Sequence, residues 1–489
     1  MDFLDPNKRR KHTIRLFIGY GLVGIALLIG TSIIALYAYG YDFNRKTGTV
    51  IQNGLVFVDS RPVSADIYLN GESKGKTGAR LVIPEGQYKV ELVSKGYRTW
   101  KKDLILGGSV LERLVYPVLF PEKLITKDVE LFTAAPSFIS ESPDRHWLIV
   151  QPTASVSEYQ VYDLTTTTNK PLTLSLPASL FSTAAGTHKI ELVEWSADNR
   201  RLVVRHSYTG GIEYVLVDRE SPTSSQNLSK FFAQTSAQIS LRDKKYDQYY
   251  MYDPSALTLS TAELKSKTTT PVLQGVLAFK SHGSDTILYK TRVGAQADKD
   301  LLMLRVGTNT YILRELPRSD IHMLDVARFD SRWYMVVVSA VEGRTYVFRD
   351  PENLIKREPT KKPAPVAAMK LDNPKNLSFS TNSRFVVVQS GSAFAVYDSE
   401  DTRQLRFDTK LKTSATDIAT WMDGHRMTIL SEGKLRVFDF DGNNLQILNT
   451  VEGGYGAYFD KDYKAMFTIG QSTSASGKIA LQRTELRVN

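Results

Sequence analysis

The chain has 489 residues and not one cysteine. This absence excludes disulfide bonds and thiolate metal sites, and it also excludes a lipid attached to an N-terminal cysteine. Any part of the chain that lies outside the cytoplasm must therefore be stabilised by packing alone.

Short catalytic motifs are missing as well. The only near match to a G-x-S-x-G serine nucleophile, residues 470–474 (GQSTS), lacks the final glycine. Residues 71–77 (GESKGKT) are one residue short of a phosphate-binding loop and lie in a predicted hairpin, without the strand–loop–helix context of such a loop. We therefore expect neither serine hydrolysis nor nucleotide binding.

The histidines and carboxylates form no local cluster. Beyond the N-terminal tail, no histidine stands two or four positions from another, so we expect no metal and no cofactor; these residues are His146, His188, His206, His282, His322 and His425. Carboxylate pairs such as Glu191 with Glu194 are expected at strand edges. The sequence does not show whether two carboxyls meet in a cleft, as a glycosidase requires, so that alternative stays open.

Charge is modest for the size of the chain. The formal net charge is +10, and about +7 remains without residues 1–15, because these hold five cations and two acids. Such a bias permits weak attraction to anionic polymers or lipid headgroups. No basic stripe interleaved with aromatic residues is present, so we expect no nucleic acid partner.

One apolar run dominates the sequence. It begins at Leu16 and ends at Tyr39 without a charged residue, and as a helix it is roughly 36 Å long, enough to cross a membrane. The preceding residues 1–15 form a short basic tail, whereas Arg45 and Lys46 are the only close cations after the run. The positive-inside bias then predicts a cytoplasmic N-terminus, with these topology determinants: Lys8, Arg9, Arg10, Lys11 and Arg15.

The alternative to an anchor is a cleaved signal peptide. Its apolar core is about 7–15 residues long and ends at small residues. Here the run is longer, and Leu36, Tyr37 and Tyr39 occupy its exit. A retained single-pass helix over residues 16–39 is therefore predicted, with the rest of the chain outside the cytoplasmic membrane.

A small β domain follows, after a polar stalk at residues 40–53. Within residues 54–120, alternating apolar and polar residues predict strands at 54–60, 65–71, 79–83, 87–94 and 99–106. The pair Asn70-Gly71 predicts a tight turn.

This region resembles a PEGA domain, a small β-sandwich-like module associated with cell surfaces. The resemblance lies in the turn Pro84, Glu85 and Gly86, in Asn70-Gly71, and in Gly96-Tyr97 followed by Trp100. Gln87 stands where the family has alanine. The resemblance implies spacing, adhesion or assembly near a surface, and no catalytic residue.

Residues 121–489 contain an irregular repeat of about 45 residues, the period of a four-stranded propeller blade. Each unit has an aromatic or apolar residue, a short polar turn and three to five β-formers, as in Phe379-STNSRFVVV. A later strand often closes on an acid, as in Val396-Tyr397-Asp398. We predict an all-β protein, apart from the helix, with a propeller of seven or eight blades.

These units resemble WD40-like or TolB-like repeats, with W-S-x-D at Trp195, Ser196 and Asp198. Such a repeat carries no function by itself. Trp195, Trp333 and Trp421 recur at similar places in the repeats; core packing explains them, and sugar stacking is the alternative.

Taken together, these features predict a non-enzymatic, membrane-anchored envelope protein. Its outer domains are expected to bind a protein or an anionic wall polymer. The alternative is a propeller-type enzyme that acts on envelope polysaccharide.

Overall fold

A computed structural model describes residues 6–44, 48–166, 170–234, 237–283, 285–358, 361–414, 416–452 and 454–488. The chain divides into two compact units, Met1–Lys123 with Val488–Asn489 and Leu124–Arg487. Each unit is described by itself. Val488, which the sequence placed in the propeller, belongs to the first unit, where its N–H donates to the Tyr97 hydroxyl at 2.8 Å.

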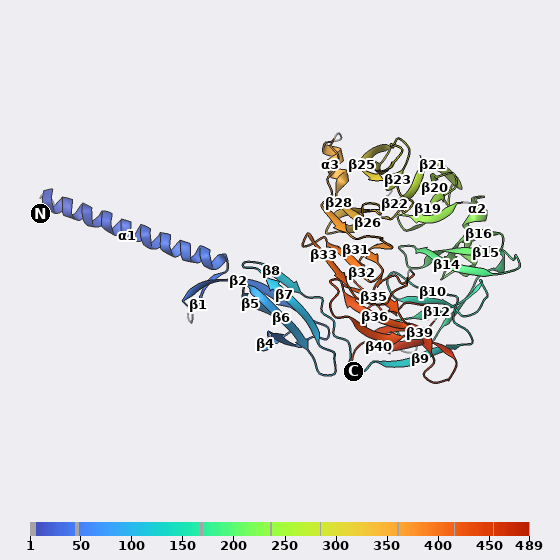
Figure 1. Ribbon diagram of the computed structural model, residues 1–489, viewed down its shortest axis with the longest axis horizontal. Helices are drawn as coiled ribbons and strands as arrows, with labels where there is room; N and C mark the ends of the chain where they lie inside the picture. Colours follow the sequence, from blue (N-terminus) through green and yellow to red (C-terminus); the bar gives the residue numbers. More distant parts are fainter. Residues whose placement is uncertain are drawn as a thin grey trace. The chain divides into compact units, whose positions relative to one another are not determined.

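The first unit opens with one long helix, α1 (Pro6–Ala38), and its segment Arg9–Ala38 is long and apolar enough to cross a membrane (Figure 1). Tyr39, predicted as the end of the span, lies in the turn after the helix. Arg9, Arg10, Lys11 and Arg15 lie within the helix instead of a separate tail, since lysine and arginine continue a helix readily. The side chain of Lys8, and both Arg45 and Lys46, lie outside the described residues.

Residues 40–53 were expected to be a stalk, but the structure places most of them in a sheet. β1 (Tyr41–Asn44) pairs antiparallel with β2 (Thr49–Val58), because β-branched residues at 49–51 favour extended backbone. Gly40 makes the turn from α1 with φ +79°, and a Cβ there would lie 2.7 Å from the Asn53 carbonyl oxygen. Only two residues therefore separate the helix from the sheet.

The rest of the unit is a sandwich of two four-stranded sheets. One contains β1, β2, β5 (Ala79–Pro84) and β8 (Leu111–Leu114); the other contains β4 (Glu72–Lys76), β3 (Asp66–Leu69), β6 (Gly86–Val93) and β7 (Trp100–Leu106). The turn Pro84, Glu85 and Gly86 carries the chain from β5 in the first sheet to β6 in the second. Alternate residues such as Val56, Val90 and Trp100 are buried between the sheets.

The described residues of the second unit form eight four-stranded antiparallel sheets. In seven of them the strands follow one another in sequence. The first three sheets are β10 (Phe138–Glu141), β11 (Trp147–Gln151), β12 (Glu158–Asp163) and β13 (Leu172–Ser175); β14 (His188–Trp195), β15 (Arg201–Tyr208), β16 (Gly211–Asp218) and β17 (Gln226–Asn227); and β18 (Gln238–Arg242), β19 (Lys245–Asp253), β20 (Thr258–Glu263) and β21 (Thr268–Gln274).

The next four sheets repeat this order. They are β22 (Val276–His282), β23 (Thr286–Thr291), β24 (Lys299–Val306) and β25 (Asn309–Pro317); β26 (Leu324–Phe329), β27 (Arg332–Ser339), β28 (Arg344–Arg349) and β29 (Ala367–Lys370); β30 (Asn376–Phe379), β31 (Phe385–Ser390), β32 (Ala393–Asp398) and β33 (Arg403–Asp408); and β34 (Thr420–Trp421), β35 (Arg426–Ser431), β36 (Lys434–Asp439) and β37 (Gln446–Thr450). Two short helices lie between strands, α2 (Leu228–Phe231) and α3 (Pro351–Arg357).

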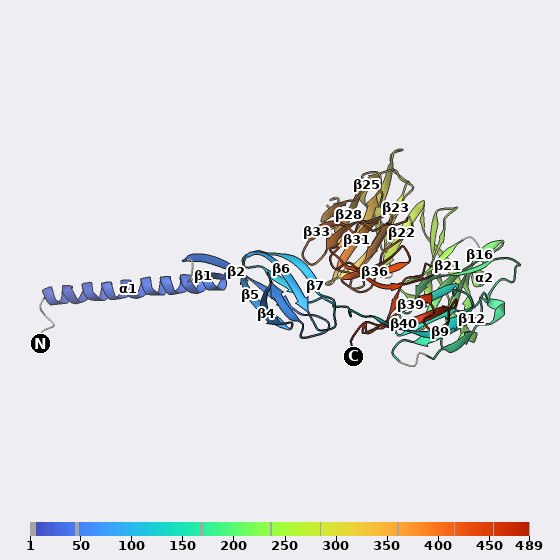
Figure 2. The ribbon, with the colours of Figure 1, turned by 60° about the horizontal axis from the view of Figure 1, so that its bottom comes forward.

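The eighth sheet joins the two ends of the unit. It contains β38 (Tyr458–Phe459), β39 (Ala465–Gln471), β40 (Ile479–Glu485) and, as its fourth strand, β9 (Ile125–Phe132) from the start of the unit. Figures 1 and 2 show the cyan β9 beside the red β40. Pairing of first and last strands holds the eighth sheet together without a covalent bond, as a chain without cysteine requires.

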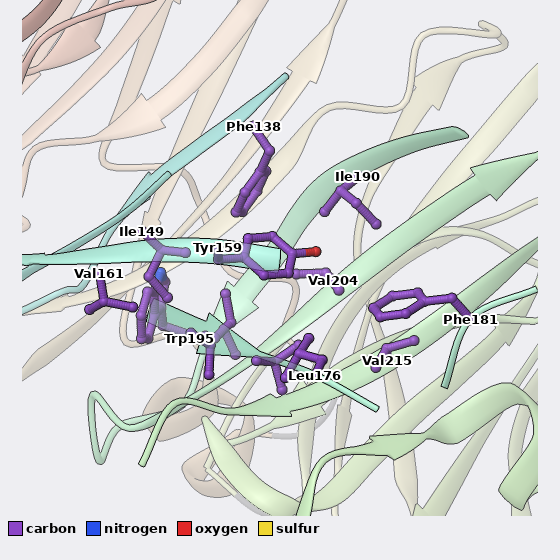
Figure 3. Close-up of a cluster of buried hydrophobic side chains, with 13 residues drawn as sticks. Phe138, Ile149, Tyr159, Val161, Leu176, Phe181, Ile190, Trp195, Val204 and Val215 are labelled. Atoms are coloured by element: carbon purple, nitrogen blue, oxygen red, sulfur yellow. The ribbon is translucent and has the colours of Figure 1, made fainter. Parts of the chain in front are cut away.

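Neighbouring sheets share apolar cores around the ring. Figure 3 shows one such core, in which Phe138 and Tyr159 from the first sheet meet Trp195, Val204 and Val215 from the second. Another core joins the eighth sheet to the first through Phe467, Leu148 and their neighbours. Because apolar cores join neighbouring sheets and the last sheet packs on the first, the unit is a closed β-propeller.

Candidate functional site

The strongest candidate site is a cavity inside the ring. First strands of neighbouring sheets contact one another, as β14 contacts β18 and β22 contacts β26, so these strands line the inside of the propeller. A cavity of about 480 Å³ lies where they turn into the second strands. We call it the inner cavity; residues that line it include Glu194, Asp243, Lys244, Lys280, Asp325 and Trp333.

Glu194 lies at one side of the inner cavity, on β14. A bulge between Leu192 and Glu194 interrupts the regular alternation of the strand and re-aims the side chains that follow. The Glu194 carboxylate accepts a hydrogen bond from the N–H of Leu241 in the next sheet, and it forms an ion pair with the Lys244 ammonium. Glu191, which the sequence paired with Glu194, instead contacts Lys189 and Arg205. The two carboxylates therefore have separate roles.

Asp325, on β26, carries the second carboxylate of interest. Its Oδ1 lies 3.7 Å from the Lys280 Nζ and accepts the N–H of Val326 at 2.9 Å. Burial raises the pKa of Asp325 above its ordinary value, and the Lys280 charge opposes part of that rise. The Lys280 side chain is 55% exposed, so its ammonium can meet a ligand while it still neutralises Asp325.

An aromatic wall completes the cavity. The Trp333 ring stacks on His282 with centroids 3.6 Å apart, and His282 Nε2 lies 2.7 Å from Glu352 Oε1 on α3. The His282 ring therefore lies between the Glu352 carboxylate and the indole. Phe279 and Tyr250 form a second aromatic pair on the lining, edge to face, with ring centroids 5.5 Å apart.

The charge of the lining limits what the cavity can bind. Among the described residues it carries the carboxylates of Glu194, Asp243 and Asp325 and the ammonium groups of Lys244 and Lys280. The Glu194 carboxylate is paired with Lys244, and the Asp325 carboxylate is paired with Lys280. The lining is therefore mixed in charge and does not have the cationic excess that binding of a polyanion requires.

The three tryptophans that were expected at similar places in the repeats do not all occupy equivalent positions. Trp195 ends β14 and Trp421 ends β34, both first strands, and each indole N–H donates to a serine of the preceding sheet, at 2.9 Å to Ser140 and 3.1 Å to Ser378. Trp333 lies on a second strand, β27, and lines the inner cavity. It is therefore not equivalent to the other two.

Two histidines that are separate in sequence come together. His188 Nδ1 lies 2.9 Å from His206 Nε2, and His206 Nδ1 lies 2.8 Å from Glu213 Oε1. Glu213 also accepts from Ser182 N at 2.6 Å and Asn227 Nδ2 at 2.7 Å. Only the pairing of β14 with β15 reveals this cluster. Its polar atoms are satisfied by protein, which indicates a structural role.

No group of three or more His, Asp or Glu side chains within the described ranges is arranged to hold a metal ion. The turn residues Pro84, Glu85 and Gly86 lie on the first unit, in a separate place from the inner cavity. The Glu85 N–H donates to the Gln52 carbonyl at 2.8 Å, and the Tyr88 hydroxyl donates to the Pro84 carbonyl at 2.7 Å. These contacts indicate that the turn joins two sheets.

Comparison with family models confirms the resemblance of the small domain. Residues 53–108 match the PEGA domain. The match begins within β2, continues through β7 and includes the turn at Pro84, Glu85 and Gly86. The chain thus carries a PEGA domain between an apolar helix and a propeller.

Several solved propellers are similar to the chain. Hsv2 of Kluyveromyces lactis is 13% identical, covering 64% of this chain and 98% of its own, with a TM-score of 0.40. An oligogalacturonate lyase from Vibrio parahaemolyticus is 9% identical over 75% of this chain and 97% of its own, with a TM-score of 0.38. The propeller of Dos1 is 11% identical over 75% and 96%, with a TM-score of 0.42. No curated protein matches the chain.

Proposed function

We propose that this chain is a non-enzymatic binding protein, anchored in the cytoplasmic membrane by α1, whose PEGA domain and propeller lie outside the cell membrane. The observation that carries the proposal is the inner cavity, which joins a stacked indole to two lysine–carboxylate pairs. Such a lining recognises a ligand with both charged and apolar groups.

The anchor is supported by the length of the helix and by the charges near its start. The segment Arg9–Ala38 is suited to cross a membrane, and Arg9, Arg10, Lys11 and Arg15 precede or open the apolar part. Positive residues stay in the cytoplasm. The N-terminus is then inside, and both folded units are outside.

Between the two partners expected from the sequence, the cavity favours a protein over an anionic wall polymer. Three carboxylates line it beside two lysines, and these acids would repel a polyanion. A protein segment with basic, acidic and apolar side chains can satisfy the lysines and carboxylates together. It can also place an apolar side chain against Trp333.

The test compares charge reversals inside and outside the cavity. Tagged full-length chain is expressed in its host, crosslinked in the membrane and purified, and the crosslinked proteins are identified. We expect Lys244→Glu and Lys280→Glu to abolish one specific crosslinked partner. The matched control is Lys412→Glu, an 87% exposed lysine that pairs with Glu432 outside the inner cavity, and it should keep that partner.

Two results would contradict the binding role. One is a set of crosslinked proteins that is the same in the wild type and both cavity variants. The other is a partner that remains when the whole propeller is deleted. If wall polymer is recovered instead of protein, and if both cavity variants lose that polymer, the partner is an anionic wall polymer and not a protein.

A polysaccharide-cleaving enzyme is the second candidate. It is favoured by one observation, that Glu194 and Asp325 line the same cavity and that burial raises the pKa of Asp325, as a general acid needs. The two lysine pairs argue against it. If purified chain releases reducing sugar from envelope polysaccharide, and Asp325→Asn abolishes that release, the enzymatic function replaces the binding function.

A further inference from the structure

One sheet of the PEGA domain has an unusual outer face. Leu55 on β2 lies opposite both Val82 on β5 and Leu111 on β8, and Phe57 lies opposite both Arg80 and Arg113. Residues opposite one another in a sheet point to the same side. We call these six residues the β2 face.

The β2 face is open and its cations are unpaired. Val82 is 61% exposed and Leu111 is 46% exposed, and both arginines are exposed. Within the described part of the chain, neither Arg80 nor Arg113 forms an ion pair. The face thus combines apolar side chains with two free guanidinium groups.

The other sheet of the same domain presents a different surface. Its outer residues include two ion pairs, Lys101 with Glu91 at 2.7 Å and Lys76 with Asp66 at 3.0 Å, and Lys89 lies opposite Asp103. Ile105 is an exposed apolar residue on this surface. Such a surface is suited to water. The two arginines of the β2 face have no such acidic partner among the described residues.

The β2 face begins where α1 ends. The Tyr39 carbonyl accepts from Gln52 Nε2 at 3.3 Å, and the Gly40 carbonyl accepts from Asn53 N at 2.7 Å. A cavity of about 470 Å³ lies between the two elements, and its lining includes Tyr39, Tyr41, Leu55, Arg80, Val82 and Leu111. With only Tyr39 and Gly40 between helix and sheet, the domain cannot move far from the point where the helix leaves a membrane.

We propose that the β2 face lies on the bilayer surface, with its apolar side chains at the headgroup level and Arg80 and Arg113 bound to anionic lipid phosphates. This inference rests on the proposed role of α1 as a retained anchor. Tyrosine and arginine beside a membrane span favour the interface, and basic side chains near an anionic leaflet are attracted to it. The nearby acids are Asp42 on β1 and Asp59, whose Oδ1 accepts the Ser60 N–H at 2.8 Å.

The absence of cysteine permits a clean test, because a single introduced thiol labels one position. Leu111→Cys places a polarity-sensitive fluorophore on the β2 face, and Ile105→Cys, at a site 78% exposed on the other sheet, serves as the matched control. Each full-length variant is reconstituted into vesicles of phosphatidylcholine with a minority of phosphatidylglycerol and a headgroup nitroxide lipid. We expect strong quenching for Leu111→Cys and little for Ile105→Cys.

The contribution of Arg80 and Arg113 is measured with the same fluorophore at position 111. Adding Arg80→Glu and Arg113→Glu should lower the quenching at position 111 to the level of position 105, whereas adding Lys101→Glu should leave it unchanged. Equal quenching at both positions in the unmodified background would overturn the proposal. So would a disulfide that links two copies through the unlabelled Leu111→Cys thiol under air oxidation in detergent without lipid, since the face would then be a dimer contact.

Flotation of the same vesicles separates this inference from the proposed anchor. If the full-length chain fails to float with vesicles, or is found without its helix, the anchor is wrong. If it floats and the label at position 111 is not quenched, the anchor stands and the membrane-facing role of the β2 face is wrong.

Discussion

Arg384 and Asp398 form a buried ion pair within one sheet of the propeller. The Arg384 Nε lies 2.9 Å from one oxygen of Asp398 and its Nη2 lies 2.7 Å from the other, and the Asp398 side chain is fully buried. Arg384 comes from the turn before β31, and Asp398 ends β32. The same relationship recurs as Arg200 with Asp218 at 2.8 Å and as His146 with Asp163 at 3.2 Å.

We expect Asp398→Asn to destabilise the propeller by about 2–3 kcal/mol, because a guanidinium that is only 15% exposed would lose its main partner. Glu400 and Asp401 still contact Arg384, which keeps the loss near the lower end for a broken buried pair. Denaturant unfolding of the full-length chain in detergent, followed by tryptophan fluorescence, measures it. Asp163→Asn is the matched control, since this pair is 29–39% exposed and should cost under about 1 kcal/mol. Equal losses would show that burial does not govern these pairs.

The local part of this arrangement was predictable from the sequence. The run Val396-Tyr397-Asp398 indicated a strand that closes on an acid, and β32 does end at Asp398. Alternation also indicated β3, β5, β6 and β7 of the PEGA domain. It missed β4, whose five residues are all exposed, and β8, in which only Leu114 is buried. Strands without an alternating buried face leave no periodic signal.

The inner cavity could not be predicted in the same way. Glu194 and Lys244 are fifty positions apart and belong to successive sheets, and they meet because those sheets pack side by side. In the sequence, Lys244 is a lysine in a turn and Glu194 is a glutamate at a strand edge. No pattern in the sequence indicates that the two are in contact. The short distance between α1 and β1 was missed for a similar reason, since residues 40–53 are polar but gain partners in the sheet.

A second prediction concerns the link between the first two sheets of the propeller. Trp195 and Ser140 are each 4% exposed, and their hydrogen bond crosses between the sheets at 2.9 Å. Trp195→Phe keeps an aromatic ring, smaller than the indole, and removes the donor, so we expect a coupling energy of about 1 kcal/mol with Ser140→Ala in a double-mutant cycle. Unfolding of all four proteins in urea gives that value. Strictly additive losses would mean that the indole acts through packing alone.

A third prediction concerns Asp128 on β9, which fastens the loop of the last sheet. Its carboxylate accepts from the hydroxyls of Ser472 and Ser474, both at 2.7 Å, and from the N–H of Ser474 at 3.0 Å. Burial alone would raise the pKa of Asp128, but these hydrogen bonds from Ser474 and Ser472 hold it well below its ordinary value. The carboxylate thus stabilises the ring closure above about pH 4, and this contribution is lost as the pH falls further.

For Asp128→Asn we expect a loss of about 1–3 kcal/mol at pH 7, because an amide cannot accept all of these donors. The difference from the wild type should begin to shrink below about pH 4. Thermal unfolding across this pH range measures both effects. Asp462→Asn, at an exposed aspartate paired with Lys464, is the control and should change little. A pH-independent loss at position 128 would contradict the role of the ionised carboxylate.

The last prediction concerns Glu141, which ends β10 beside the eighth sheet. Its Oε2 accepts the Phe459 N–H at 3.0 Å, and its Oε1 lies 4.0 Å from Arg145 Nε. Burial raises the pKa of Glu141 to about 7, although Arg145 and the Phe459 N–H oppose that rise. Because the folded state then holds the proton more tightly than the unfolded chain, stability should fall as the pH rises from about 4.5 to about 7.

Glu141→Gln keeps an oxygen for the Phe459 N–H and removes the charge. We therefore expect this variant to equal the wild type near pH 4.5 and to exceed its stability at pH 8 by about 1–3 kcal/mol; the shift alone would correspond to the upper value, and the 27% exposure of the side chain reduces it. Urea unfolding at these two pH values measures the difference. A variant that is less stable than the wild type at pH 8 would show that the ionised carboxylate, held by Arg145, strengthens the junction between the first and eighth sheets.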